Sequence, residues 1–199
     1  MAEHVRFTEE MKGHVGFGAH DYWDGYRLGV ERHTPLMFHL TIEVDDIGPF
    51  LADPEHEATA TGWVGCPALG GDRLAVTEGR FNLFAPATRP GRQAMRYRLF
   101  FADGEGRPTT LAGFKDIGDD PGLDTWKDTT SLSTKVMPGH VDAAGEAAVT
   151  PLALGLIYIR IPDFAKQLTT FRGSPRGVWS FGKLFAATLW EVYRGGGAG

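Results

Sequence analysis

An alternating run from Leu36 to Val44 is the feature that most constrains how this chain can fold. Successive side chains of a β-strand point to opposite faces, so one face of this run is entirely apolar. Asp46 follows, where it can cap a short helical turn that carries Ile47, Phe50 and Leu51. The run therefore predicts a half-buried strand that leads directly into a capped turn.

The same order of residues recurs near the end of the chain, in the segment 156–168. Asp163 and Phe164 stand there where the first copy has Asp46 and Ile47. We interpret the two strand-turn units as anchors of one sheet that closes on itself.

Short β-prone runs fill most of the remaining chain, separated by many of the 27 glycines and 12 prolines. Glycine and proline scattered between such runs are typical of the turns of all-β proteins. We count eight or nine strands, which predicts a single closed antiparallel β-barrel of calycin or lipocalin type, with an open sandwich as the alternative. The barrel domain would span 1–194, and 195–199 would form a tail.

Residues 175–194 are expected to form a C-terminal helix, because apolar residues recur there at helical spacing: Val178, Phe181, Phe185, Leu189 and Val192. We expect this helix to pack against the outer wall of the barrel, with Trp179 or Trp190 at its margin. Met37 and Phe100, which alternation directs outward, would provide an apolar strip for it. The alternative is a docking surface for a membrane or a protein partner.

Composition argues against several functions. The net charge of -5 disfavours nucleic-acid binding. The one cysteine, Cys66, excludes an internal disulfide framework and fits a reducing compartment. No apolar stretch is long enough to cross a bilayer, so we expect a soluble cytoplasmic protein.

Catalytic and cofactor motifs are missing from the sequence. No GxGxxG follows a strand and no P-loop occurs, so we expect neither flavin, nicotinamide nor ATP as a cofactor. The seven histidines lack metal-ligand spacing, and no serine lies in a GxSxG elbow. We therefore expect no cofactor and no metal.

The candidate ligand-binding residues are those that alternation directs to one face of successive strands. Small barrels either fill their interior with such side chains or enclose one apolar ligand. The set comprises Phe38, Leu40, Phe81, Leu83, Tyr97, Leu99 and Phe101, joined by Trp126 in the acidic connection 119–128.

A polar set on the strands gives weak candidates for catalysis: His39, Glu43, Arg96, Arg98 and Lys115. These residues fit the solvated outer face of the barrel better than an acid-base group inside it. Should they face inward, His39, Glu43 and Lys115, together with Tyr97, would act as acid, base or hydrogen-bond donor.

Several segments, among them FTEEMKGHVGFG, LMFHLTIEVDD, YRLFFADGEG and DFAKQLTTF, carry a resemblance that spans nearly the whole chain. They resemble a bacterial accessory domain associated with cholesterol-oxidase-like flavin oxidoreductases of the glucose-methanol-choline class. The resemblance implies a lipid or steroid-like context, with this chain as a free-standing relative that lacks the flavin domain. It implies no catalytic residues.

These observations lead to two functional hypotheses. The first is a binding module or carrier for an apolar small molecule, such as a lipid, terpenoid or steroid-like compound, held in the barrel interior. The second is a cofactor-independent cyclase or isomerase that acts on a hydrophobic polyene, polyketide or steroid-like substrate in the same place.

Overall fold

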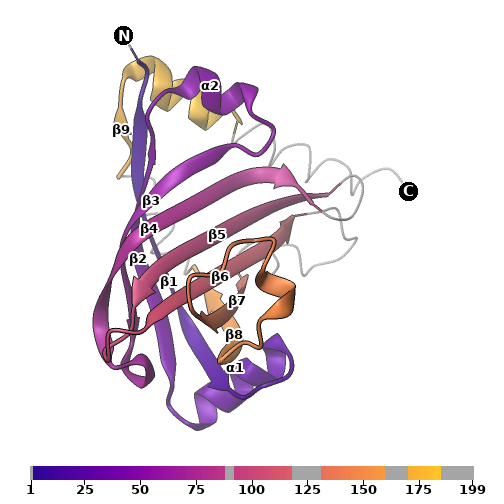
Figure 1. Ribbon diagram of the computed structural model, residues 1–199. Coiled ribbons are helices and arrows are strands. Elements are labelled where there is room, and N and C mark those ends of the chain that lie inside the picture. The colour runs from indigo at the N-terminus through magenta and orange to yellow at the C-terminus, as the bar shows by residue number, and fades with distance from the viewer. Residues whose placement is uncertain (1, 88–91, 118–130, 160–169, 185–199) are drawn as a thin grey trace.

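The computed structural model describes residues 2–87, 92–117, 131–159 and 170–184, and it shows a closed antiparallel β-barrel (Figure 1). Eight strands form the barrel and a ninth pairs with β1 outside it. The strands are β1 (Val5–Phe17), β2 (Pro35–Val44), β3 (Glu57–Cys66), β4 (Gly71–Pro86), β5 (Gln93–Ala102), β6 (Pro108–Ile117), β7 (Ser131–Pro138), β8 (Ala153–Tyr158) and β9 (Arg172–Gly173). The helices are α1 (Tyr22–Glu31) and α2 (Ile47–Ala52), and residues 175–184 are also helical.

Strand β1 closes the barrel because it pairs on both of its edges. It pairs with β2 from Val5↔Val44 to His14↔Pro35, and with β8 from Lys12↔Tyr158 to Phe17↔Ala153. The other neighbours follow chain order from β2 to β8. Closure gives each of these eight strands a neighbour on both sides, and it confirms the predicted closed barrel.

The predicted anchor strand is confirmed as β2, in which buried and half-buried residues alternate. The Asp46 carboxylate accepts a hydrogen bond from the backbone N–H of Gly48 and caps α2, whose Ile47 and Phe50 are buried. The strand of the second copy is β8. Asp163 and Phe164, which were predicted to match Asp46 and Ile47, lie outside the described residues.

Helix α1 covers part of the outer wall of the barrel, a role that was expected for the C-terminal helix. It packs on β1 and β8, where its Tyr26 contacts the outward-facing rings of His14 and Tyr158. Gly25 and Gly29 permit the close approach. A Cβ on Gly25 would lie 2.0 Å from the carbonyl oxygen of Leu154.

We expect Gly25→Ala to lower the free energy of unfolding by at least about 1 to 3 kcal/mol. The added methyl group would overlap backbone atoms of β8, which cannot move aside as the end of a flexible side chain could. Urea unfolding measures this change. Gly182→Ala is the matched control: Gly182 is also helical, a Cβ added to it would meet no neighbouring atom within 4 Å, and alanine should stabilise by up to about 1 kcal/mol. Equal effects of both substitutions would contradict this account of α1.

The helical residues 175–184 lie at one end of the barrel beside α2, not along its outer wall (Figure 1). Phe181 is buried there against Phe50 of α2 and against Phe7, which faces the barrel interior. Trp179 is 66% exposed, as expected for the margin of the helix. The predicted contacts of Phe185, Leu189 and Trp190 fall outside the described residues.

A different segment covers the outward-facing side chains of β5. Phe100 is buried with its ring stacked on His140, and the guanidinium of Arg98 donates to the carbonyl oxygen of Val141 and to the carboxylate of Glu146. The connection between β7 and β8 therefore lies against this part of the wall. The outward-facing Phe100 is therefore covered by this connection and not by the described residues of the C-terminal helix.

Candidate functional site

The barrel interior is lined mainly by apolar side chains. Seven of the predicted ligand-binding residues are buried in its core: Phe38, Leu40, Phe81, Leu83, Tyr97, Leu99 and Phe101. The ring of Tyr97 lies between two of them, with its centroid 5.3 Å from that of Phe38 and 4.8 Å from that of Phe81. Trp126, the eighth predicted residue, lies outside the described residues.

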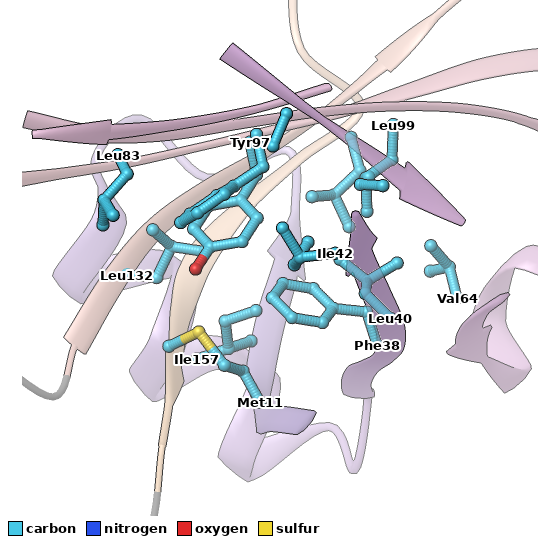
Figure 2. Packing of buried hydrophobic residues seen from close by; sticks show 14 of the residues in the cluster. Met11, Phe38, Leu40, Ile42, Val64, Leu83, Tyr97, Leu99, Leu132 and Ile157 are labelled. Atoms are coloured by element: carbon cyan, nitrogen blue, oxygen red, sulfur yellow. The ribbon is translucent and has the colours of Figure 1, made fainter. Parts of the chain in front are cut away.

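Glu9 introduces a carboxyl group into this apolar interior. Alternation along β1 directs Phe7, Glu9 and Met11 inward, and only 7% of the Glu9 surface is exposed. The Tyr97 hydroxyl donates a hydrogen bond of 2.8 Å to Glu9 Oε2. Figure 2 shows the Tyr97 oxygen projecting inward, among carbon atoms of Leu132 and other core residues.

This hydrogen bond crosses the barrel from one wall to the other. Glu9 lies on β1 and Tyr97 on β5, which are four strands apart in either direction around the closed sheet. The two side chains therefore meet in the middle of the core and not along one wall.

Lys115 is the third ionisable group of the interior. It shares a face of β6 with the buried Leu111 and Ile117, and it pairs across the sheet with Met95 of β5. The residue is half-buried and lies two positions from the end of the strand. We call Glu9, Tyr97 and Lys115 the interior polar cluster.

Burial shifts the acidities of all three groups. Desolvation raises the pKa of Glu9 to about 7, although the Tyr97 hydrogen bond and the charge of Lys115 favour its carboxylate. Desolvation lowers the pKa of Lys115 to about 8, against the attraction of Glu9. The pKa of Tyr97 is raised well above its usual value by burial, then by the neighbouring carboxylate. A carboxyl and an amine can thus each gain or lose a proton close to neutral pH.

Gln93 adds a polar atom at the same end of the interior. Alternation places it on the face of β5 that carries Met95 and Tyr97. Its Oε1 atom is buried and, among the described residues, has no hydrogen-bond partner. A buried acceptor of this kind is costly unless something donates to it.

His39 and Glu43, two of the predicted acid-base candidates, do not join the interior polar cluster. They occupy the opposite face of β2 from Phe38, Leu40 and Ile42, which are fully buried. His39 Nδ1 lies 3.3 Å from Glu10 Oε2, and its ring stacks on Trp63. Both residues therefore belong to the outer face.

Two further polar residues of that predicted set, Arg96 and Arg98, also bind partners on the outer face, through Glu55 and Glu146 respectively. The outer-face interpretation is wrong for Lys115 alone. Alternation with Leu111 and Ile117 would have placed Lys115 inside, had its own strand been analysed position by position.

Sequence reasoning missed Glu9, the central residue of the cluster. Glu9 lies in the first half of β1, which begins at Val5, and none of the candidate sets included a residue of this strand. The signal was present in the alternation of Val5, Phe7 and Met11, which places the intervening Glu9 on the same face.

The cysteine thiol and the potential metal ligands of the described residues give no second candidate site. Cys66 is buried, and burial raises the pKa of its thiol, so the reactive thiolate is disfavoured. Within the part of the chain that the structure describes, no three His, Cys, Asp or Glu side chains gather as metal ligands would. None of the helices described is both long enough and apolar enough to cross a membrane.

Comparisons of this chain with protein-family models, with curated proteins and with solved structures find no match.

Proposed function

We propose that the barrel binds a largely apolar small molecule, a lipid, terpenoid or steroid-like compound, whose single polar group engages the interior polar cluster. The observation that supports this most strongly is the hydrogen bond between Tyr97 and Glu9 across a mainly apolar core.

This cluster is hard to explain by stability alone. Ionisable groups in a core lose their hydration, and apolar residues of similar size often serve a fold as well or better. Glu9 has Phe7 and Met11 as inward-facing neighbours on its own strand, so an apolar residue would suit the packing. Perturbed ionisable groups in such surroundings are characteristic of functional sites.

The chemistry of the interior defines the class of ligand. Aromatic and aliphatic walls favour an apolar body, because burial of apolar surface contributes about 25 cal/mol per Å². Tyr97, Lys115 and Gln93 Oε1, which has no partner among the described residues, then select for one hydroxyl or carbonyl group. The resemblance to an accessory domain of cholesterol-oxidase-like proteins agrees with such a lipid or steroid-like ligand.

A fluorescent apolar probe such as Nile red tests the proposal by competition. We expect saturable displacement by a sterol or a long-chain alcohol. Tyr97→Phe removes one oxygen atom and should lower the affinity for the alcohol by roughly threefold to tenfold. The affinity for a hydrocarbon of the same length should not change.

Tyr158→Phe is the matched control, because Tyr158 lies on the outer face of β8 under α1. It should leave both affinities unchanged. If the chain does not bind Nile red, or if no apolar compound displaces the bound probe, the proposed function is wrong.

A cofactor-independent isomerase or cyclase acting on the same class of ligand is the second candidate. Glu9 favours it, since a carboxyl group with a pKa of about 7 is suited to moving protons at neutral pH. Such an enzyme would exchange deuterium into a bound ketone at the carbon next to the carbonyl, and Glu9→Gln would abolish the exchange.

A further inference from the structure

We propose that the Lys115 amine forms an imine with the carbonyl group of an apolar aldehyde or ketone inside the barrel. In this reaction Glu9 transfers the protons, and the Tyr97 hydroxyl donates a hydrogen bond to the carbonyl oxygen. This inference rests on the proposed function, because the apolar interior must first bind the body of the ligand.

The position of Lys115 distinguishes it from the other described lysines. Lys12 lies on the outer face of β1 and pairs with Glu10, while Lys135 pairs with Glu146 on the outer wall. Lys183 is exposed on the C-terminal helix beside Trp179. Among the lysines that the structure describes, Lys115 alone belongs to the interior face and interacts with Glu9.

Access and surroundings both suit this chemistry. Lys115 is half-buried and lies near the end of β6, away from the centre of the core. Burial also lowers its pKa to about 8, so that roughly one amine in ten is neutral at pH 7. An amine desolvated among apolar groups is a recognised way to activate a lysine nucleophile.

The remaining members of the cluster supply what the two steps need. The lone pair of the neutral amine attacks the carbonyl carbon, a C–N bond forms, and the carbonyl π electrons move to oxygen. This oxygen takes a proton from the Glu9 carboxyl, and the resulting Glu9 carboxylate takes one from the positively charged nitrogen, which gives a carbinolamine. Glu9 then protonates the carbinolamine hydroxyl, which leaves as water while the nitrogen lone pair forms the C=N bond, and the product is a protonated imine. The Tyr97 hydroxyl has one hydrogen, which it donates to Glu9 in the structure and can turn toward the ligand oxygen in both steps.

Reductive trapping tests the inference directly. The full chain is incubated with dodecanal and cyanoborohydride, which reduces any imine to a stable secondary amine. Intact-mass measurement should show the addition of one dodecyl group, and peptide mapping should locate it on Lys115. Acetaldehyde, which carries the same carbonyl without the apolar body, should modify the chain far more slowly and without preference for Lys115.

Variants separate position from simple reactivity. Lys115→Met should lose the adduct, whereas Lys12→Met, which removes a lysine of the outer face, should keep it. Glu9→Gln should retain the adduct but form it roughly 100-fold more slowly, as expected when a general acid is removed. Unfolding curves and Nile red binding establish that each variant is folded.

The outcomes distinguish this inference from the function it rests on. An adduct spread over several lysines of the wild-type chain overturns the inference, and this result needs no variant. Displaceable probe binding without any trapped adduct also overturns it, but leaves the proposed function standing. Absence of both binding and adduct removes the two together.

Discussion

Replacing Phe181 with alanine should lower the free energy of unfolding by about 3 to 5 kcal/mol. Only 2% of its surface is exposed, and its ring centroid lies 5.5 Å from that of Phe7 and 5.9 Å from that of Phe50. The substitution leaves a cavity where the C-terminal helix meets α2 and the end of the barrel. Urea unfolding followed by tryptophan fluorescence measures the loss.

Trp179→Ala provides the control from the same helix. Its ring is mostly exposed, so its removal should change stability by about 0.5 kcal/mol or less. If Phe181→Ala unfolded at the same urea concentration as the wild type, the helix would not be part of the cooperative fold. The aromatic contacts would then contribute little.

Replacing Glu9 with glutamine should stabilise the protein by about 2 to 3 kcal/mol at pH 8 and change little at pH 5. At pH 8 the wild-type chain must keep a carboxylate in its core, whereas glutamine is neutral and can still accept the hydrogen bond from Tyr97. At pH 5 the wild-type carboxyl is itself protonated. Urea unfolding at the two pH values gives both differences.

The direction of the pH effect follows from the raised pKa of Glu9. Between about pH 4.5, the ordinary value of a glutamate, and about pH 7, the folded chain binds more protons at this group than the unfolded chain. Stability from Glu9 is therefore present below pH 4.5 and lost as pH rises to 7. Lys115, whose pKa is lowered, affects stability at higher pH and in the opposite direction. Stability should rise again between about pH 8 and 10.5.

Glu10→Gln is the matched control for this experiment. Glu10 is the next residue, faces outward, and pairs with Lys12 and His39, which contribute to lowering the pKa of its carboxyl. Its substitution should cost up to about 1 kcal/mol at pH 8. A loss of stability in Glu9→Gln at pH 8 would show that the buried carboxylate is well stabilised in the fold, contrary to our account.

The fold could be predicted largely because alternation is a local signal. The run from Leu36 to Val44 contains its own strand, its apolar face and the Asp46 cap that ends it. Prediction of the helix α1 would instead require knowledge of contacts with residues far away in the sequence. Gly25 and Gly29 weaken a helix when judged by propensity alone, but they allow it to approach β1 and β8. No local pattern shows that a strand 129 residues away supplies the surface that these glycines fit.

The interior polar cluster shows the same limit. Tyr97 was identified as an inward-facing residue, yet its partner Glu9 lies 88 residues earlier in the sequence, on another strand. Glu9 and Lys115 looked like ordinary charged residues, and charged residues mostly lie on the surface. Only the register around the closed sheet brings a carboxyl, a phenol and an amine into one interior.

Barrel closure through β1 also sets the order in which the chain can fold as it is synthesised. Strand β1 can form its ladder with β2 early, since the two are close in sequence. Its other edge must wait for β8, which emerges more than a hundred residues later. Until then, the earliest strand of the chain keeps one edge open to other strands, including those of neighbouring nascent chains. The half-finished barrel, rather than the native one, is therefore the species most in need of protection by chaperones.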